Sequence, residues 1–104
     1  MTQTSQTSET ELIVLREEGP TRGRYVIHLA PGQDAEMTFR KEADGSITID
    51  HTGVPPAFEG RGIAARLVNK AIADAREQGF RITPVCSYVE AQFRRHPEWA
   101  DLRA

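Results

Sequence analysis

Residues 54–68 read VPPAFEGRGIAARLV, and this stretch decides the fold because the hydrophobic pattern changes within it. Before it, apolar residues alternate with polar ones, which is typical of half-buried β-strands. After it, apolar residues recur every three or four positions, which is typical of an amphipathic α-helix. Gly60 and Gly62 stand immediately before the helix. Free backbone N–H groups and the positive end of a helix dipole coincide there, so the stretch predicts a binding site for an anion such as a phosphate.

Four strands are expected before this junction, separated by turns that contain glycine or proline. In chain order they fall within residues 11–17, 23–30, 35–40 and 46–52. Short connections between successive strands predict an antiparallel meander. In the fourth strand, simple alternation places His51 on the same face as Ile47 and Ile49.

A helix, a fifth strand and a second helix are expected after the junction. The first helix covers residues 62–78 and ends at Gly79. The strand covers residues 80–86, where Pro84 cannot donate a ladder hydrogen bond and marks a sheet edge. The second helix covers residues 87–95. A strand–helix–strand unit normally joins parallel strands, so the fourth and fifth strands should be parallel in a layered α+β fold, with the junction at the carboxyl end of the fourth.

The length, charge and composition of the chain exclude several classes of protein. Its 104 residues have room for a single domain, and its net charge of -2 argues against a general nucleic-acid binder. No apolar run approaches the roughly 20 residues that span a membrane. A single cysteine rules out a disulfide within the chain, and residues 1–10 lack the character of a signal peptide. We expect a cytoplasmic protein with a disordered tail at residues 1–10 and one domain at residues 11–104.

The glycine pair by itself leaves two interpretations open. It either seats an anion or only permits a tight turn and close packing of the helix. No Lys-Ser or Lys-Thr follows, as a P-loop would require, and the third glycine of the dinucleotide fingerprint is missing.

Four motifs together are more specific than the glycine pair. They are His51-Thr52-Gly53-Val54-Pro55, Gly60-Arg61-Gly62-Ile63-Ala64 with Leu67-Val68, Pro84-Val85-Cys86-Ser87-Tyr88-Val89, and Arg95-His96-Pro97-Glu98. In this order they resemble the Gcn5-related N-acetyltransferase superfamily, and more narrowly its small one-domain branch, often called the YjdJ type. The resemblance runs from about Tyr25 to the C-terminus. It implies a GNAT-like fold and transfer of an acetyl group from acetyl-coenzyme A to an amine, without a metal.

The resemblance also implies roles for individual residues. The pantetheine arm of coenzyme A would lie between the splayed ends of the fourth and fifth strands. The residues implied to hold the coenzyme are Val54, Gly60, Arg61, Gly62, Ile63, Ala64, Ala65 and Ser87. Three residues are candidates for the chemistry, namely Cys86, Tyr88 and His51.

Each catalytic candidate carries an alternative. Cys86 either accepts the acetyl group covalently or lines the pocket, and a free cysteine is commonly just a small buried residue. His51 would take a proton from the amine, or else be hydrogen-bonded within the sheet. Tyr88 would protonate the departing thiolate, or else pack at the start of the second helix.

Glu59 departs from the superfamily pattern, which usually has Gln or Arg at this position. A carboxylate beside a pyrophosphate is repulsive, so we expect weaker coenzyme binding, offset by Arg61 and Arg66. The helices that larger relatives place after the first strand are missing, so an open site suits a protein lysine, a protein N-terminus or a small amine. We expect a monomer or weak dimer with no nucleic-acid or membrane partner. The competing hypotheses are a non-catalytic acyl-coenzyme A binding module and, outside the family, a general phosphate- or nucleotide-binding domain.

Overall fold

The computed structural model describes residues 12–104 and places five strands in one sheet, in the order β1-β2-β3-β4-β5. The strands are β1 (Leu15–Glu18), β2 (Arg22–Ala30), β3 (Gln33–Lys41), β4 (Ile47–Gly53) and β5 (Ile82–Pro84). Neighbours from β1 to β4 are antiparallel, whereas β4 and β5 are parallel. The predicted meander and parallel pair are both confirmed. The tail expected at residues 1–10 lies outside the described residues.

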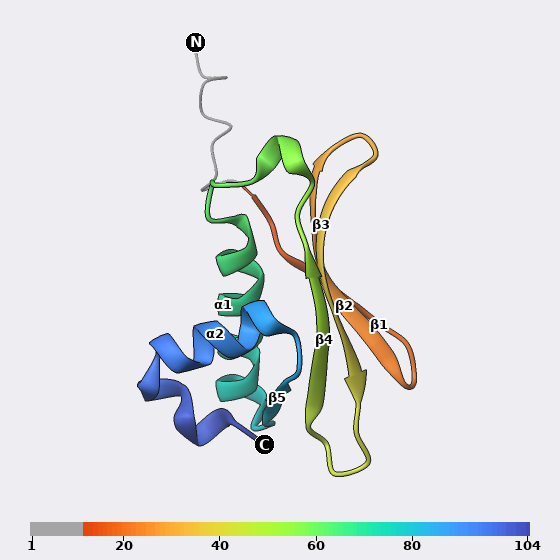
Figure 1. Ribbon diagram of the computed structural model, residues 1–104. Coiled ribbons are helices and arrows are strands. Elements are labelled where there is room, and N and C mark those ends of the chain that lie inside the picture. Colours follow the sequence, from red (N-terminus) through yellow and green to blue (C-terminus); the bar gives the residue numbers. More distant parts are fainter. Residues whose placement is uncertain (1–11) are drawn as a thin grey trace.

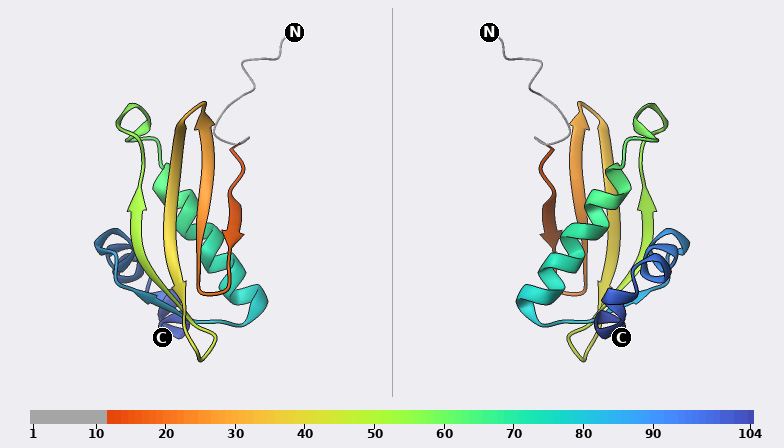
Figure 2. Two further views of the ribbon diagram at one scale, coloured as in Figure 1. Left: turned by 90° about the vertical axis from the view of Figure 1, so that its right-hand side faces the viewer. Right: turned by 90° about the vertical axis from the view of Figure 1, so that its left-hand side faces the viewer.

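Two α-helices and two short 3-10 segments complete the chain. They are η3 (Pro56–Phe58), α1 (Ile63–Gln78), α2 (Ser87–Arg95) and η4 (Pro97–Leu102). Both α-helices lie on the same side of the sheet in Figure 1, and α1 runs across the strands in Figure 2. No described helix covers the opposite face of the meander, so this face stays open. None of the helices within residues 12–104 is both long and apolar enough to cross a membrane.

The core lies between the sheet and α1, as the two hydrophobic patterns predict. Apolar side chains of β2, β3 and β4 meet the buried stripe of α1; those with no more than 1% exposure include Tyr25, Ile27, Met37, Phe39, Ile49, Leu67, Val68 and Ala71. The helix ends where expected, because Gly79 adopts a left-handed φ of 77° and donates its N–H to Ala75 O at 2.8 Å. This packing fixes the start of α1 beside the end of β4.

The two outer strands are shorter than predicted. The first strand begins at Leu15, and the preceding Leu12 and Val14 pack against the core outside the ladder. The fifth strand ends at Pro84 because a proline cannot continue the ladder.

A β-bulge in β4 interrupts its pairing with β3. Phe39 pairs with Ile49, but the preceding residue of β3, Thr38, pairs with His51. Asp50 is therefore an extra residue with no partner in this register, which is the definition of a bulge.

The bulge reverses the alternation of side chains beyond it. Thr52 now stands opposite the buried Met37, whereas His51 is exposed and stands opposite Thr38 on the open face. The prediction that His51 shares the face of Ile49 is wrong, because it assumed an unbroken ladder.

Candidate functional site

A hollow of about 340 Å³ lies where β4 ends and α1 begins. Its wall comes from the end of β4, the connection through η3, and the first residues of both α-helices. The lining residues are Thr52, Gly53, Val54, Phe58, Glu59, Gly60, Gly62, Ile63, Ala64 and Tyr88. This is the carboxyl end of a strand in a parallel pair, where ligands of such units commonly bind.

The two glycines shape the floor of the hollow. Gly60 has a φ of +80° and Gly62 a φ of +74°, a left-handed conformation that side-chain-bearing residues adopt only with strain. A Cβ atom built on either glycine would meet no atom within 4 Å, so the space in front of this backbone is open. A ligand group can therefore approach the main chain closely.

The start of α1 presents unpaired hydrogen-bond donors to the same space. Its N-cap, Gly62, has no side chain to bond the first N–H groups, and the first turn contains no acidic residue. The N–H groups of Ile63 and Ala64 belong to this turn, and both residues line the hollow. Free donors and the positive helix end together favour an anion here.

The parallel strands separate just below the hollow. Their pairing stops at Ile49 and Pro84, and Ile49 O accepts both the Val85 N–H and the Cys86 N–H at 3.0 Å. Beyond this point, β4 continues from Asp50 to Gly53 with no described strand on that side. Its free edge is available to an extended ligand.

Cys86 adjoins the hollow at this divergence. The residue is partly buried, and its Sγ lies 3.4 Å from Thr52 Oγ1. Thr52 reaches this face only because the bulge reverses the alternation. Cys86 therefore lies at the point where β4 and the start of α2 begin to separate.

Tyr88 lines the hollow from the first turn of α2. Burial raises the pKa of its phenol, and the positive charge of Arg95 opposes this effect only in part. The phenol therefore stays protonated at neutral pH, as a proton donor must.

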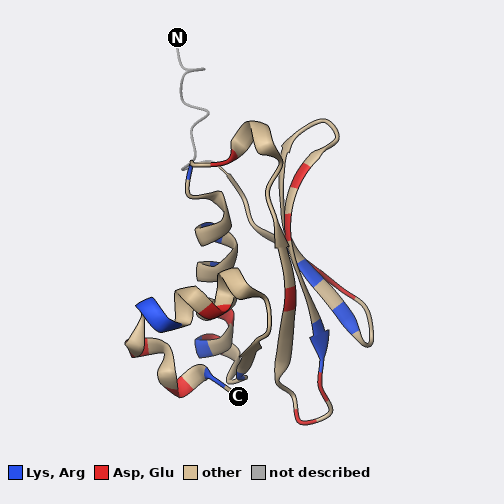
Figure 3. Ribbon diagram, in the orientation of Figure 1, with Lys and Arg blue, Asp and Glu red and all other residues tan. Residues whose placement is uncertain are grey.

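The charge around the hollow is sparse. Glu59 is the one charged side chain among the described lining residues. Arg61 is exposed, and its guanidinium lies 5.3 Å from the centre of the Phe58 ring. Figure 3 shows this acidic and this basic position in the connection between β4 and α1. Any anion would have to rely first on main-chain donors.

The structure brings together most of the residues that the sequence singled out. Those that line the hollow are Val54, Gly60, Gly62, Ile63, Ala64 and Tyr88. Cys86 adjoins it, whereas Arg61, Ala65 and Ser87 are outside the lining and His51 faces the open side of the sheet.

Three lining residues, Thr52, Gly53 and Phe58, were not predicted to belong to the site. Phe58 had a signal, because an aromatic residue stood between the prolines and the glycine pair. Thr52 and Gly53 stood in the first of the four motifs, but the face on which Thr52 lies depends on the bulge.

Other places in the described chain fit a ligand less well. A hollow of about 390 Å³ lies near Gly79 and Arg81, against the turn between β3 and β4. It is at the opposite end of α1, away from the carboxyl end of β4. Across residues 12–104, no group of three His, Cys, Asp or Glu side chains is placed to hold a metal ion.

Comparison with known proteins gives one family-level finding. The family model described as GCN5-related N-acetyl-transferase matches residues 24–102. No curated protein matches the chain. The matched segment begins within β2 and contains β3 to β5, both α-helices and the hollow.

Proposed function

The chain belongs to the GCN5-related N-acetyltransferase family, and from this premise we propose that it transfers an acetyl group from acetyl-coenzyme A to an amine. The observation that carries the proposal is the hollow at the start of α1, where open main-chain donors adjoin the free edge of β4. These two features suit the two parts of the coenzyme, a pyrophosphate and an extended pantetheine arm.

In the proposed complex, main-chain groups supply the first hydrogen bonds to the coenzyme. The pyrophosphate would accept hydrogen bonds from the loop and from the first turn of α1, between Gly60 and Ala65. Arg61 and Arg66 would add positive charge without lining the hollow themselves. The arm would run along Val54 and the free edge of β4, so that its thioester reaches the divergence beside Cys86.

Transfer requires two proton movements. As the amine nitrogen bonds to the thioester carbon, the carbon–sulfur bond breaks, the amine loses a proton and the thiolate gains one. The protonated phenol of Tyr88 is our proposed donor to the thiolate. The exposed imidazole of His51 is our proposed acceptor of the amine proton, reached from the open face of the sheet.

Cys86 is better suited to line the reaction point than to carry the acetyl group. Among the described side chains, its thiol is hydrogen-bonded only to the hydroxyl of Thr52, so the paired base that activates a covalent nucleophile is missing from that part of the chain. We therefore propose direct transfer from the thioester to the amine.

The acceptor is proposed to be an exposed amine. No described helix covers the open face of the meander, and Val85, directly before Cys86, is 61% exposed. Such an approach suits a lysine or N-terminus of a protein, or a small amine held by few contacts. The motifs and the single cysteine further lead us to propose a YjdJ-type monomer or weak dimer that works in the cytoplasm.

One observation favours a second candidate function. Glu59 is one of the lining residues, and its negative charge would repel a pyrophosphate bound in the hollow. A non-catalytic module that binds acyl-coenzyme A weakly and reversibly would tolerate this arrangement.

Binding is tested by mapping backbone amide shifts while acetyl-coenzyme A is added. We expect the largest shifts at residues 52–54, 60–65 and 86–88. Shifts confined to the hollow near Gly79 and Arg81, or no shifts at all, would contradict the assignment.

A further inference from the structure

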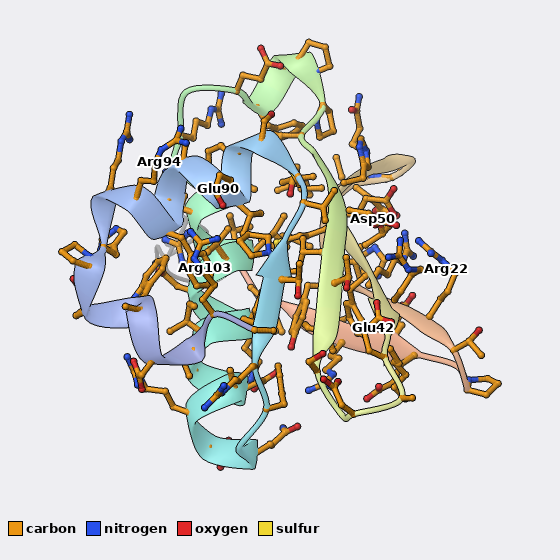
Figure 4. The ribbon with its side chains drawn as sticks, turned by 60° about the horizontal axis from the view of Figure 1, so that its bottom comes forward. Arg22, Glu42, Asp50, Glu90, Arg94 and Arg103 are labelled. Atoms are coloured by element: carbon orange, nitrogen blue, oxygen red, sulfur yellow. The ribbon has the colours of Figure 1, made fainter. Side chains whose placement is uncertain are left out.

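A cluster of polar side chains on the open face of the sheet holds the bulge in β4. The Asp50 carboxylate accepts a hydrogen bond from Thr38 Oγ1 at 2.6 Å and another from Arg22 Nη2 at 2.9 Å. These donors come from β3 and β2, so one side chain links three strands. Figure 4 shows Arg22 and Asp50 side by side at this position.

Asp50 lies directly between two groups that the transfer reaction needs. The residue before it, Ile49, uses its carbonyl to hold the N–H groups of Val85 and Cys86. The residue after it is His51. Asp50 therefore lies at the point where β4 and β5 stop pairing, and the bulge at this residue turns the imidazole of His51 to the open face.

The carboxylate is well satisfied although it is not deeply buried. Its side chain is 24% exposed, and that of Arg22 is 51% exposed. The hydrogen bond from Thr38 is short, and Thr38 is the residue of the neighbouring strand that pairs with His51. Hydrogen bonds to an ionised acceptor are stronger than neutral ones, so this cluster can hold an extra residue in place.

We propose that Asp50 is a positioning residue of the transferase site, which fixes the bulge and thereby the placement of His51, Thr52 and the β5 end. The inference rests on the proposed function for its catalytic part. Its structural part, that Asp50 helps to hold the end of β5 against β4, does not depend on the proposed function.

The open face offers a matched control. Asp34 Oδ1 lies 2.8 Å from His28 Nδ1, so this carboxylate also links neighbouring strands. Within residues 12–104, its side chain makes no hydrogen bond to the bulge in β4. Replacing Asp34 by alanine removes the same chemical group from the same face.

The experiment compares Asp50→Ala, Asp50→Asn and Asp34→Ala with the unmodified protein. Amide hydrogen exchange at Val85 and Cys86 reports on the β5 end without any need for activity. Steady-state kinetics and acetyl-coenzyme A titration separate kcat from binding of the coenzyme. If Asp50 only stabilised the fold, Asp50→Ala would lower the melting temperature without a selective loss of kcat over coenzyme binding.

We expect Asp50→Ala to speed exchange of both amides at least tenfold and to lower kcat at least tenfold. Its dissociation constant for acetyl-coenzyme A should stay within about threefold. Asp50→Asn should be intermediate because its carbonyl still accepts from Thr38, and Asp34→Ala should leave exchange and kcat unchanged. Unchanged exchange, or an unchanged kcat in Asp50→Ala, would overturn the proposal. If the unmodified protein transfers no acetyl group, the proposed function fails, and the exchange rates alone decide the role of Asp50 in tethering β5.

Discussion

The Sγ atom of Cys86 lies 3.4 Å from Oγ1 of Thr52, across the point where β4 and β5 stop pairing. Among the described side chains, no base is hydrogen-bonded to this thiol, whereas a covalent nucleophile needs a base within hydrogen-bond reach. We predict that Cys86→Ala retains turnover within about tenfold. Mass spectrometry of the unmodified protein, incubated with acetyl-coenzyme A but no amine, should show no acetylated Cys86. Loss of turnover together with an acetylated cysteine would establish the covalent route instead.

Tyr88 is expected to supply the proton for the departing thiolate. Burial raises the pKa of its phenol, so the proton remains available throughout the neutral range. Tyr88→Phe should lower kcat about 100-fold, the scale of general acid catalysis, while the affinity for acetyl-coenzyme A changes little. Steady-state kinetics with a titration of the coenzyme measures both quantities. A kcat equal to that of the unmodified protein would remove Tyr88 from the mechanism.

Gly62 is expected to be required for coenzyme binding rather than for stability alone. Gly62→Ala forces a left-handed conformation that costs roughly 1–2 kcal/mol and puts a methyl group in front of the main-chain donors. The affinity for acetyl-coenzyme A should fall at least tenfold.

Gly32 provides the matched control for this variant. Its φ of +72° is almost that of Gly62, at +74°, and a Cβ atom there would also meet nothing within 4 Å. Gly32→Ala should therefore destabilise the protein to a similar extent and leave coenzyme affinity unchanged. Equal loss of affinity in both variants would argue against the loop as the binding site.

Glu59 is expected to weaken coenzyme binding. Glu59→Gln removes the one negative charge that lines the hollow and should tighten binding of acetyl-coenzyme A about two- to fivefold at low salt. The gain should shrink as salt is added. Glu77→Gln, an exposed change near the far end of α1, should have no effect. Weaker binding in Glu59→Gln would show that the carboxylate helps to shape the loop.

The buried pair of Tyr25 and Asp74 should make stability fall in alkali. Burial and the 2.8 Å hydrogen bond to Asp74 raise the pKa of Tyr25. The folded state then keeps a proton that the unfolded chain loses above about pH 10, so the stabilisation is complete below that pH and declines above it. Tyr25→Phe should lower the free energy of unfolding by about 1–3 kcal/mol and flatten this decline. Urea unfolding between pH 8 and 11 measures it, and an unchanged slope would contradict the assignment.

Much of the fold follows from the sequence because its signals are local. The change of hydrophobic period at residues 54–68 predicted the meander and α1, and Gly79 predicted the helix end. The glycine loop and Tyr88 were predicted on motifs, and both line the hollow.

The orientation of His51 and Thr52 could not be predicted from the sequence. Alternation along a strand assumes one residue per rung of the ladder, and the extra residue at Asp50 breaks that assumption. The bulge is held by Thr38 and Arg22, which are distant in the chain. Nothing near Asp50 in the sequence distinguishes it from an ordinary strand residue.

Release of the coenzyme A thiol from acetyl-coenzyme A tests the central claim most directly. The unmodified protein should be incubated with a panel that contains lysine peptides, peptides with free N-termini and small aliphatic amines. We predict that thiol release requires an amine, rises with protein concentration and matches the amount of N-acetylated product. Binding of acetyl-coenzyme A with no amine-dependent release from any member of the panel would contradict transfer and favour the binding module.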